Sequence, residues 1–225
     1  IDSLRENKVM SLRTRFGNLG NILNFDNLTK ENIYVLDTPI LSNSQFIKFK
    51  KYFEGNSKII DCTFSKNDNL KNSLDKIRSL SEAAAREGLK QLVLTDKNVN
   101  ENRLAIPMVL AVGAINSHLI KKSLRGFVSI NIETGDTLDT HSYATLLGVG
   151  ATTINPYLAF ESIRQRFNKN LFGNLNIEDC VKRYIKSVNA GLLKIMSKMG
   201  ISVLSSYRGG CNFETVGLSR AIVSE

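Results

Sequence analysis

The sequence predicts an α/β domain with a mostly parallel sheet and about five βα units. Short apolar segments of strand length alternate along the chain with longer amphipathic segments of helix length. With 225 residues, the chain is also long enough to bury a sizeable core. A closed (β/α) barrel needs eight such units, so we expect an incomplete or degenerate barrel-like fold, with an open doubly wound sheet as the alternative.

The expected strands are short runs rich in Ile, Val, Leu and Thr. They cover residues 58–63, 91–95, 126–133, 151–154 and 201–205. The expected helices cover residues 43–52, 70–86, 105–120, 140–147, 157–167 and 177–199, and a helix-like segment is expected after Gly210. Within 70–86 the apolar residues recur every three or four positions, and Gly88 is placed to end that helix.

The N-terminal part differs in pattern. Residues 11–23 mix Gly, Asn and apolar residues at neither the helix nor the strand period, so we expect an irregular segment over 1–42 and the α/β domain over 43–225. The chain begins with Ile1 rather than Met, and its last apolar stretch lacks a helix-stop pattern. We interpret it as a fragment of a larger multidomain protein.

Composition narrows the function classes. The net charge of +9 invites nucleic-acid binding, but the cations are spread along the chain, so that function is the weaker alternative. The apolar segment 105–120 is too short to span a bilayer, and we expect no membrane contact. Three widely spaced cysteines favour free thiols in a reducing, cytoplasmic compartment. Two histidines make a His-built metal site improbable.

The residues offer no complete catalytic set. Glu133 with His141 is a possible base and orienting partner, but that spacing is common. The segment 205–210 contains Arg208 and two glycines and resembles a phosphate cup, yet it matches no known phosphate or dinucleotide fingerprint. Cys211 has no identifiable His partner. We therefore expect a catalytically inactive fragment with no metal and no cofactor of its own.

Several stretches nevertheless resemble one family. They are 11–23, 38–43, 60–64, 106–115, 150–159 and 191–210, the last reading GLLKIMSKMGISVLSSYRGG. In this order they are similar to the central domain of the glutamate synthases, and they cover nearly the whole chain. Gly210 and Cys211 depart from the family, which commonly has Ala then Gln there, and Asp139–His141 stands where a His pair is common.

The resemblance implies a parent oxidoreductase of ammonia assimilation that makes L-glutamate from L-glutamine and 2-oxoglutarate. An amidotransferase domain and a domain with FMN and an iron–sulfur cluster would be partners in the same polypeptide, and a small reductase subunit would be a further partner. The sequence leaves the electron donor open among NADPH, NADH and ferredoxin. A stand-alone flavin- or phosphate-binding βα module is the alternative function.

Such a parent must move ammonia between distant sites along an enclosed path. The resemblance, together with the aperiodic Gly/Asn/apolar character of two segments, suggests that they wall this path or dock against neighbouring domains. The candidate residues are Arg13, Thr14, Arg15, Asn18, Asn21, Pro39, Ser42 and Asn43.

Overall fold

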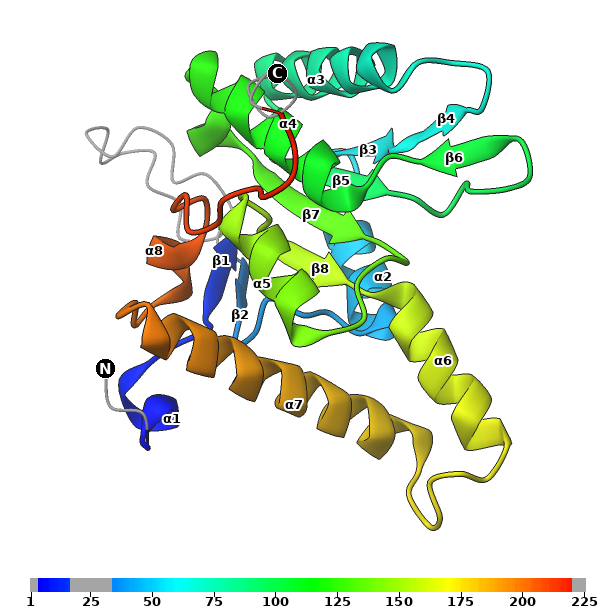
Figure 1. Ribbon diagram of the computed structural model, residues 1–225, viewed down its shortest axis with the longest axis vertical. Coiled ribbons are helices and arrows are strands. Elements are labelled where there is room, and N and C mark those ends of the chain that lie inside the picture. Colours follow the sequence, from blue (N-terminus) through cyan, green and yellow to red (C-terminus); the bar gives the residue numbers. More distant parts are fainter. Residues whose placement is uncertain (1–3, 17–33, 220–225) are drawn as a thin grey trace.

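The computed structural model describes residues 4–16 and 34–219. Its centre is a parallel sheet with the strand order β3-β5-β7-β8 (Figure 1). These strands are β3 (Ser57–Asp61), β5 (Gln91–Thr95), β7 (Ser129–Glu133) and β8 (Thr153–Asn155). The four last residues are direct register partners across the sheet, so the carboxyl ends of the strands are flush. The predicted parallel α/β fold is confirmed, and no barrel closes within the described part of the chain.

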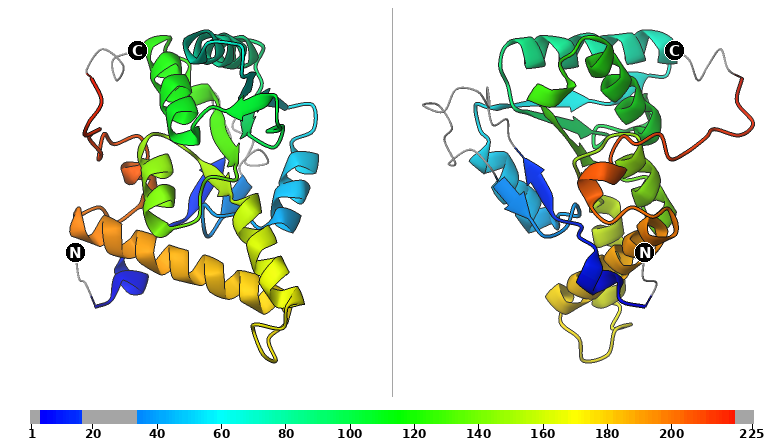
Figure 2. Two further views of the ribbon diagram at one scale, coloured as in Figure 1. Left: turned by 45° about the vertical axis from the view of Figure 1, so that its right-hand side comes forward. Right: turned by 90° about the vertical axis from the view of Figure 1, so that its left-hand side faces the viewer.

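Helices connect and cover the strands. They are α1 (Glu6–Val9), α2 (Asn43–Tyr52), α3 (Leu70–Arg86), α4 (Met108–Lys121), α5 (Thr140–Gly148), α6 (Tyr157–Asn168), α7 (Ile177–Lys198) and α8 (Leu204–Tyr207), with a 3-10 turn at Arg125–Phe127. Two small antiparallel pairs join β1 (Thr14–Phe16) to β2 (Tyr34–Leu36) and β4 (Thr63–Ser65) to β6 (Arg103–Ala105). Figure 2 shows α2, β1 and β2 on one side of the sheet and α4 and α5 on the other.

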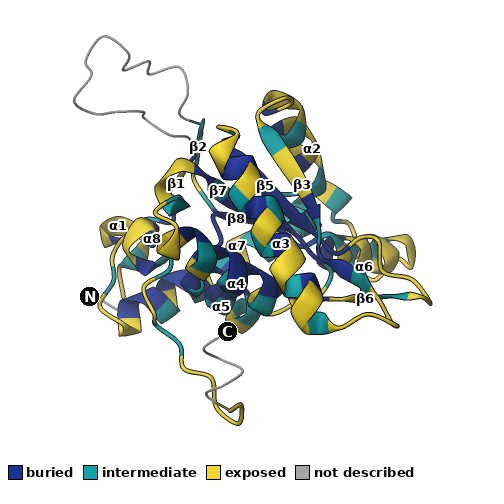
Figure 3. Cartoon of the chain, turned by 90° about the horizontal axis from the view of Figure 1, so that it is seen from above, coloured by how far each residue is buried: buried dark blue, intermediate teal, exposed yellow. Residues whose placement is uncertain are grey.

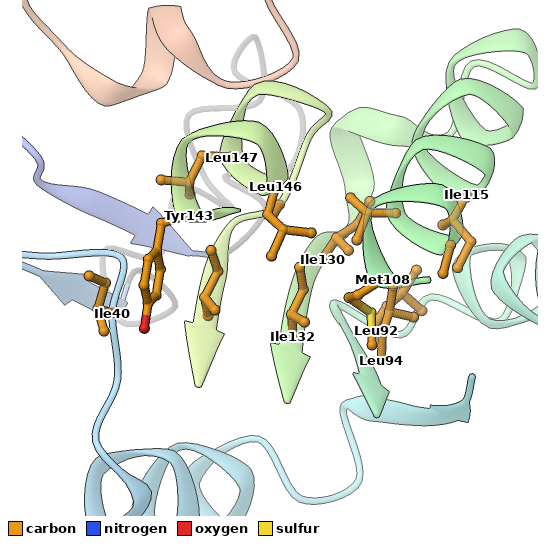
Figure 4. Packing of buried hydrophobic residues seen from close by; sticks show 14 of the residues in the cluster. Ile40, Leu92, Leu94, Met108, Ile115, Ile130, Ile132, Tyr143, Leu146 and Leu147 are labelled. Atoms are coloured by element: carbon orange, nitrogen blue, oxygen red, sulfur yellow. The ribbon is translucent and has the colours of Figure 1, made fainter. Parts of the chain in front are cut away.

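The main core lies between the sheet and helices α3, α4 and α5. Alternate strand residues point into it, among them Leu92, Leu94, Ile130 and Ile132, all fully buried (Figure 4). Seen from above, the central strands are buried while the helices carry exposed residues on their outer faces (Figure 3). Burying this apolar face is the main stabilising contribution that the strand and helix patterns provide.

The opposite face of the sheet is polar at its centre. Asn131 donates to Gln91 Oε1 at 2.9 Å and accepts from Thr153 Oγ1 at 2.7 Å, and all three side chains are fully buried. A separate aromatic cluster on α2, including Phe46 and Phe49, covers this face beside Val93. The side chains on this face are therefore held by hydrogen bonds across three strands as well as by packing.

The segment just before α2 extends the sheet. Ile40 forms a parallel bridge to Ile154 of β8, with Leu41 N donating to Ile154 O and Ile154 N donating to Pro39 O. Residues 39–41 therefore lie beside β8, although the chain then continues through α2 to β3 at the other side of the sheet. This arrangement is that of a barrel left open between residues 39–41 and β3.

Helix ends follow local capping chemistry. Asn69 Oδ1 accepts from Lys71 N at the start of α3, and Ser42 forms a capping box with Gln45 at the start of α2. Gly88 has φ +85° just after α3, a conformation that glycine adopts without strain. These local interactions explain why the predicted bounds of 43–52 and 70–86 are confirmed.

The structure corrects the prediction at the C-terminal end. The expected strand 201–205 is wrong: Val203 makes only an isolated bridge to Ser11, and residues 204–207 form α8. Leu204 and Tyr207 are both fully buried three positions apart, a spacing that suits a helical turn. The helix-like segment expected after Gly210 is not found within residues 211–219.

The N-terminal part also holds more regular structure than expected, because β1 pairs with β2. Residues 39–41 belong to the sheet. The domain boundary at residue 42 stays a prediction.

Candidate functional site

Two carboxylates at the carboxyl end of the strands, those of Glu133 and Asp61, are paired with cations. Glu133, the last residue of β7, is 5% exposed and accepts hydrogen bonds from Lys97 Nζ at 2.8 Å, Lys50 Nζ at 3.2 Å and Thr95 Oγ1 at 3.0 Å. Burial alone would raise the pKa of Glu133, but the hydrogen bonds and charges of Lys97 and Lys50 outweigh it and lower that pKa. Glu133 is therefore ionised, and both of its carboxylate oxygens already accept hydrogen bonds from neighbouring side chains.

A second pair lies at the end of β3. Asp61 accepts from Arg103 Nη2 and from Asn98 Nδ2, each at 3.0 Å, and from Thr63 Oγ1 at 2.7 Å. Burial acts to raise the pKa of Asp61, while the bonds from Asn98 and Thr63 and the charge of Arg103 lower it overall. Arg103 also donates to Thr63, so the antiparallel pair β4–β6 is fastened to the sheet at this point.

A cleft opens beside β8. It has a volume of about 660 Å³ and lies between the segment 38–45 and helices α6 and α7. Its apolar wall includes Ile40, Phe160 and Ile185. One end is fastened by a 2.7 Å hydrogen bond from Thr38 Oγ1 to Asn189 Oδ1, which ties the loop to α7. The rim carries Arg164, Lys182 and Lys186 beside Glu178.

The predicted tunnel or interface residues fall into four groups, two of which lie at or behind this cleft. Ser42 and Asn43 line this cleft, and Asn43 Oδ1 accepts from Asn155 Nδ2 at 2.9 Å. Pro39 is buried behind the cleft wall and pairs with β8.

The remaining predicted residues lie away from the cleft. Thr14 is fully buried in β1, with Arg13 and Arg15 exposed on either side of it, and none of the three lines the cleft. Asn18 and Asn21 lie outside the described residues.

The other sequence candidates are separated from one another. His141 is exposed and contacts the Phe213 ring, while Glu133 is bound to its lysines. Glu133 and His141 therefore do not act as a general base and its orienting partner. His118 Nε2 lies 2.7 Å from Glu82 Oε2 on the outer surface of α3 and α4. Cys211 is exposed with φ 54°. Burial, with the charges of Asp61 and Asp96, raises the pKa of the Cys62 thiol to about 12, so that thiol is a packing group.

Residues 4–16 and 34–219 contain neither a metal-ligand cluster nor a membrane-spanning helix. There, no group of three His, Cys, Asp or Glu side chains is arranged to hold a metal ion. Within the same ranges, no helix is both long enough and apolar enough to cross a membrane.

Sequence reasoning missed the partners of Glu133 and the walls of the cleft. Lys50 lies 83 residues from Glu133 along the chain, and Asn189 lies 151 residues from Thr38. No local pattern signals contacts over such separations. Only the flush carboxyl ends of a parallel sheet hinted that Thr95 and Glu133 would meet.

Comparison with known proteins decides the family. Residues 1–219 match the profile of the glutamate synthase central domain. The chain belongs to the glutamate synthase central domain family. It is 49% identical, over its whole length, to the glutamate synthase (NADPH) large chain of Azospirillum brasilense, and 40% identical over 99% of its length to that of Bacillus subtilis. The ferredoxin-dependent glutamate synthase of Pyropia yezoensis is 39% identical over all of it.

The glutamate synthase central domain is a small part of these relatives. The chain spans 15% of the Azospirillum protein and 14% of the Bacillus protein. These relatives are large chains of an oxidoreductase. Among solved structures, a flavocytochrome b2 variant with sulfite bound aligns with 90% of this chain and 47% of its own, at 13% identity and a TM-score of 0.47.

Proposed function

We propose that this chain is the connecting domain of a glutamate synthase, placed between an amidotransferase domain and a domain that carries FMN and an iron–sulfur cluster. The parent enzyme would make L-glutamate from L-glutamine and 2-oxoglutarate, in the cytoplasm. The relatives in which the chain occupies about a seventh of a long polypeptide support this placement.

The pairing of charges at the carboxyl end supports a role without catalysis. Ligands of α/β folds bind at that end of the strands, yet Glu133 and Asp61 there are already satisfied by Lys50, Lys97 and Arg103. These residues do not fit a flavin phosphate, because their cations are engaged by carboxylates. The three cysteines are too few for a four-cysteine cluster. We infer that both cofactors bind elsewhere in the parent.

We further propose that the cleft beside β8 forms one wall of the ammonia passage. The observation that carries this proposal is the position of Ser42 and Asn43, two of the predicted passage residues, on the lining of this cleft. Its mixed apolar and hydrogen-bonding lining suits a small neutral molecule that must be kept from bulk water. A neighbouring domain would close the open side.

Substitution of Ser42 in the full-length enzyme tests this wall. We expect Ser42→Phe to fill the passage, so that ammonia released to solvent per glutamine hydrolysed rises severalfold while the hydrolysis itself continues. Ser42→Ala is the matched control, because it removes the same hydroxyl hydrogen bonds with Gln45 without adding bulk. If Ser42→Phe releases no more ammonia than Ser42→Ala, the cleft is not the passage.

A further inference from the structure

A cluster of two arginines lies at the amino end of the strands, opposite the cleft. Arg125 precedes β7, and Arg208 follows α8. The two are near enough for the charge of Arg125 to lower the pKa of Arg208. The backbone of the next residue, Gly209, donates to Leu147 O at the end of α5, which holds α8 at this corner.

The Arg125 guanidinium is fully engaged by neutral acceptors. Its Nε donates to Asn116 Oδ1 at 2.6 Å, Nη1 to Val128 O at 2.7 Å and Nη2 to Gly150 O at 2.8 Å. Burial lowers the pKa of Arg125 to about 10, so it remains a cation at neutral pH. None of these three acceptors carries a charge, and the positive charge is therefore not neutralised.

The Arg208 guanidinium has no such partners. Its Nε is inaccessible to solvent and has no hydrogen-bond acceptor. The side chain makes no hydrogen bond or ion pair with any residue in 4–16 or 34–219. Burial, and secondarily the charge of Arg125, lowers the pKa of Arg208 to about 10. A half-buried cation beside a second cation costs stability unless an anion approaches it.

We propose that Arg208 binds the carboxylate of an Asp or Glu side chain from a flanking domain of the same polypeptide, which docks on the corner formed by α8 and the end of α7. This inference rests on the proposed placement of the chain within a longer glutamate synthase. An arginine is suited to such a contact because its planar guanidinium forms paired hydrogen bonds with a carboxylate.

The surroundings favour a protein segment over a free anion. Met199 and Val203, which lie between the end of α7 and the start of α8, are each 41% exposed. Docking of a segment would bury these apolar side chains together with the ion pair, whereas a small anion would leave them in water. Such an ion pair with an apolar surround is a typical anchor of an interface.

Carbodiimide cross-linking of the full-length protein tests the contact. A carbodiimide joins a lysine amine to a contacting carboxylate with loss of water, and guanidinium groups do not react. The Arg208→Lys variant should therefore give a cross-link from position 208 to an acidic residue outside residues 1–225, located by peptide mass spectrometry. The wild type should lack this cross-link. The Lys97–Glu133 pair, at 2.8 Å, is the internal positive control in both proteins.

Two results would overturn the proposal. One is the Lys97–Glu133 cross-link without any cross-link from position 208. The other is a cross-link from position 208 only to a carboxylate within the 225 residues.

Hydrogen exchange of Arg208→Met in the full-length protein gives a second test that does not depend on the lysine variant. Loss of a docked carboxylate should speed exchange in peptides covering α8 by about tenfold or more. Unchanged or slower exchange would overturn the proposal. Ammonia release should be unaffected by Arg208→Met, so failure of this docking contact and failure of the ammonia passage are separately visible.

Discussion

Charged side chains lie at both ends of the parallel strands, but the partners that they bind differ between the two ends. At the carboxyl end, Glu133 is held by two lysines and Asp61 by Arg103, so these two charges are neutralised within the domain. At the amino end, Arg125 is bonded only to neutral groups and Arg208 to no described residue. The Glu133 and Asp61 carboxylates are thus neutralised within the domain, while Arg208 is left for a partner to neutralise.

The largest expected effect is at Gly150, where the chain approaches Asn116 at the amino end. Gly150 has φ +122°, and a Cβ there would lie 2.5 Å from the Asn116 side chain that holds Arg125. We expect Gly150→Ala to lower the free energy of unfolding by about 3 kcal/mol through strain and displacement of Asn116. Urea unfolding measures this. Gly126→Ala, with nothing within 4 Å, is the control, and equal losses in both variants would contradict the prediction.

A smaller loss is expected at the carboxyl end. Glu133→Gln keeps the shape of the side chain but removes the charge that both lysines neutralise. Since those lysines are partly exposed, with side-chain exposures of 33% and 48%, we expect a loss of about 1–2 kcal/mol by urea unfolding. Asp75→Asn, which removes an exposed carboxylate bound to Arg78, should cost about 0.5 kcal/mol or less. Equal costs would mean that the Glu133 pairing contributes nothing beyond a surface ion pair.

The pH dependence of stability sharpens the same contrast. The pKa of Glu133 is lowered in the folded state, so its contribution is present above the pKa of the unfolded chain and is lost as pH falls through the folded value. The gap between wild type and Glu133→Gln should therefore be constant above about pH 5 and shrink on acidification below about pH 4. Urea midpoints from pH 3 to pH 7 test this. A gap independent of pH would show that the ionised carboxylate is not the cause.

The smallest effect is expected to have the opposite sign. In the 225-residue chain, Arg208→Met removes a half-buried charge that lacks an acceptor, so we expect a gain of about 1 kcal/mol in unfolding free energy. In the full-length protein the same substitution should be destabilising, because the docked carboxylate would then be buried without its cationic partner. A loss of stability in the isolated chain would mean that Arg208 is already satisfied within the domain.

The fold was predictable where local interactions decide it. The bounds of α3 match the sequence prediction because a cap, a face repeat and a terminating glycine lie within a few residues of the helix. The bounds of β5 match because the strand is a short, largely apolar run that is buried at every position. The short pair β4–β6 and helix α8 escaped prediction, since distant contacts decide them: β4 needs β6, and Leu204 N bonds to Ser11 O.

In the candidate site, too, contacts between residues distant in sequence could not be predicted. The family resemblance pointed to Ser42 and Asn43, which line the cleft, yet it gave no indication that α6 and α7 form the facing wall. It also placed Arg13, Thr14 and Arg15 beside them as candidates, although β1 holds those residues elsewhere. No sequence pattern indicates that Arg208 lacks a hydrogen-bond acceptor, so this feature is visible only in the structure.

The pairing of residues 39–41 with β8 also constrains when the domain can form. The amide of Asn155 bonds to the carbonyl of Leu41, 114 positions earlier in the chain. During synthesis from the N-terminus, residues 39–41 must wait until β8 has left the ribosome before they gain their hydrogen-bonding partner. Contacts of such long sequence separation slow folding. The wall of the cleft is therefore expected to be a late product of folding, assembled after the units from β3 to β7 have already packed.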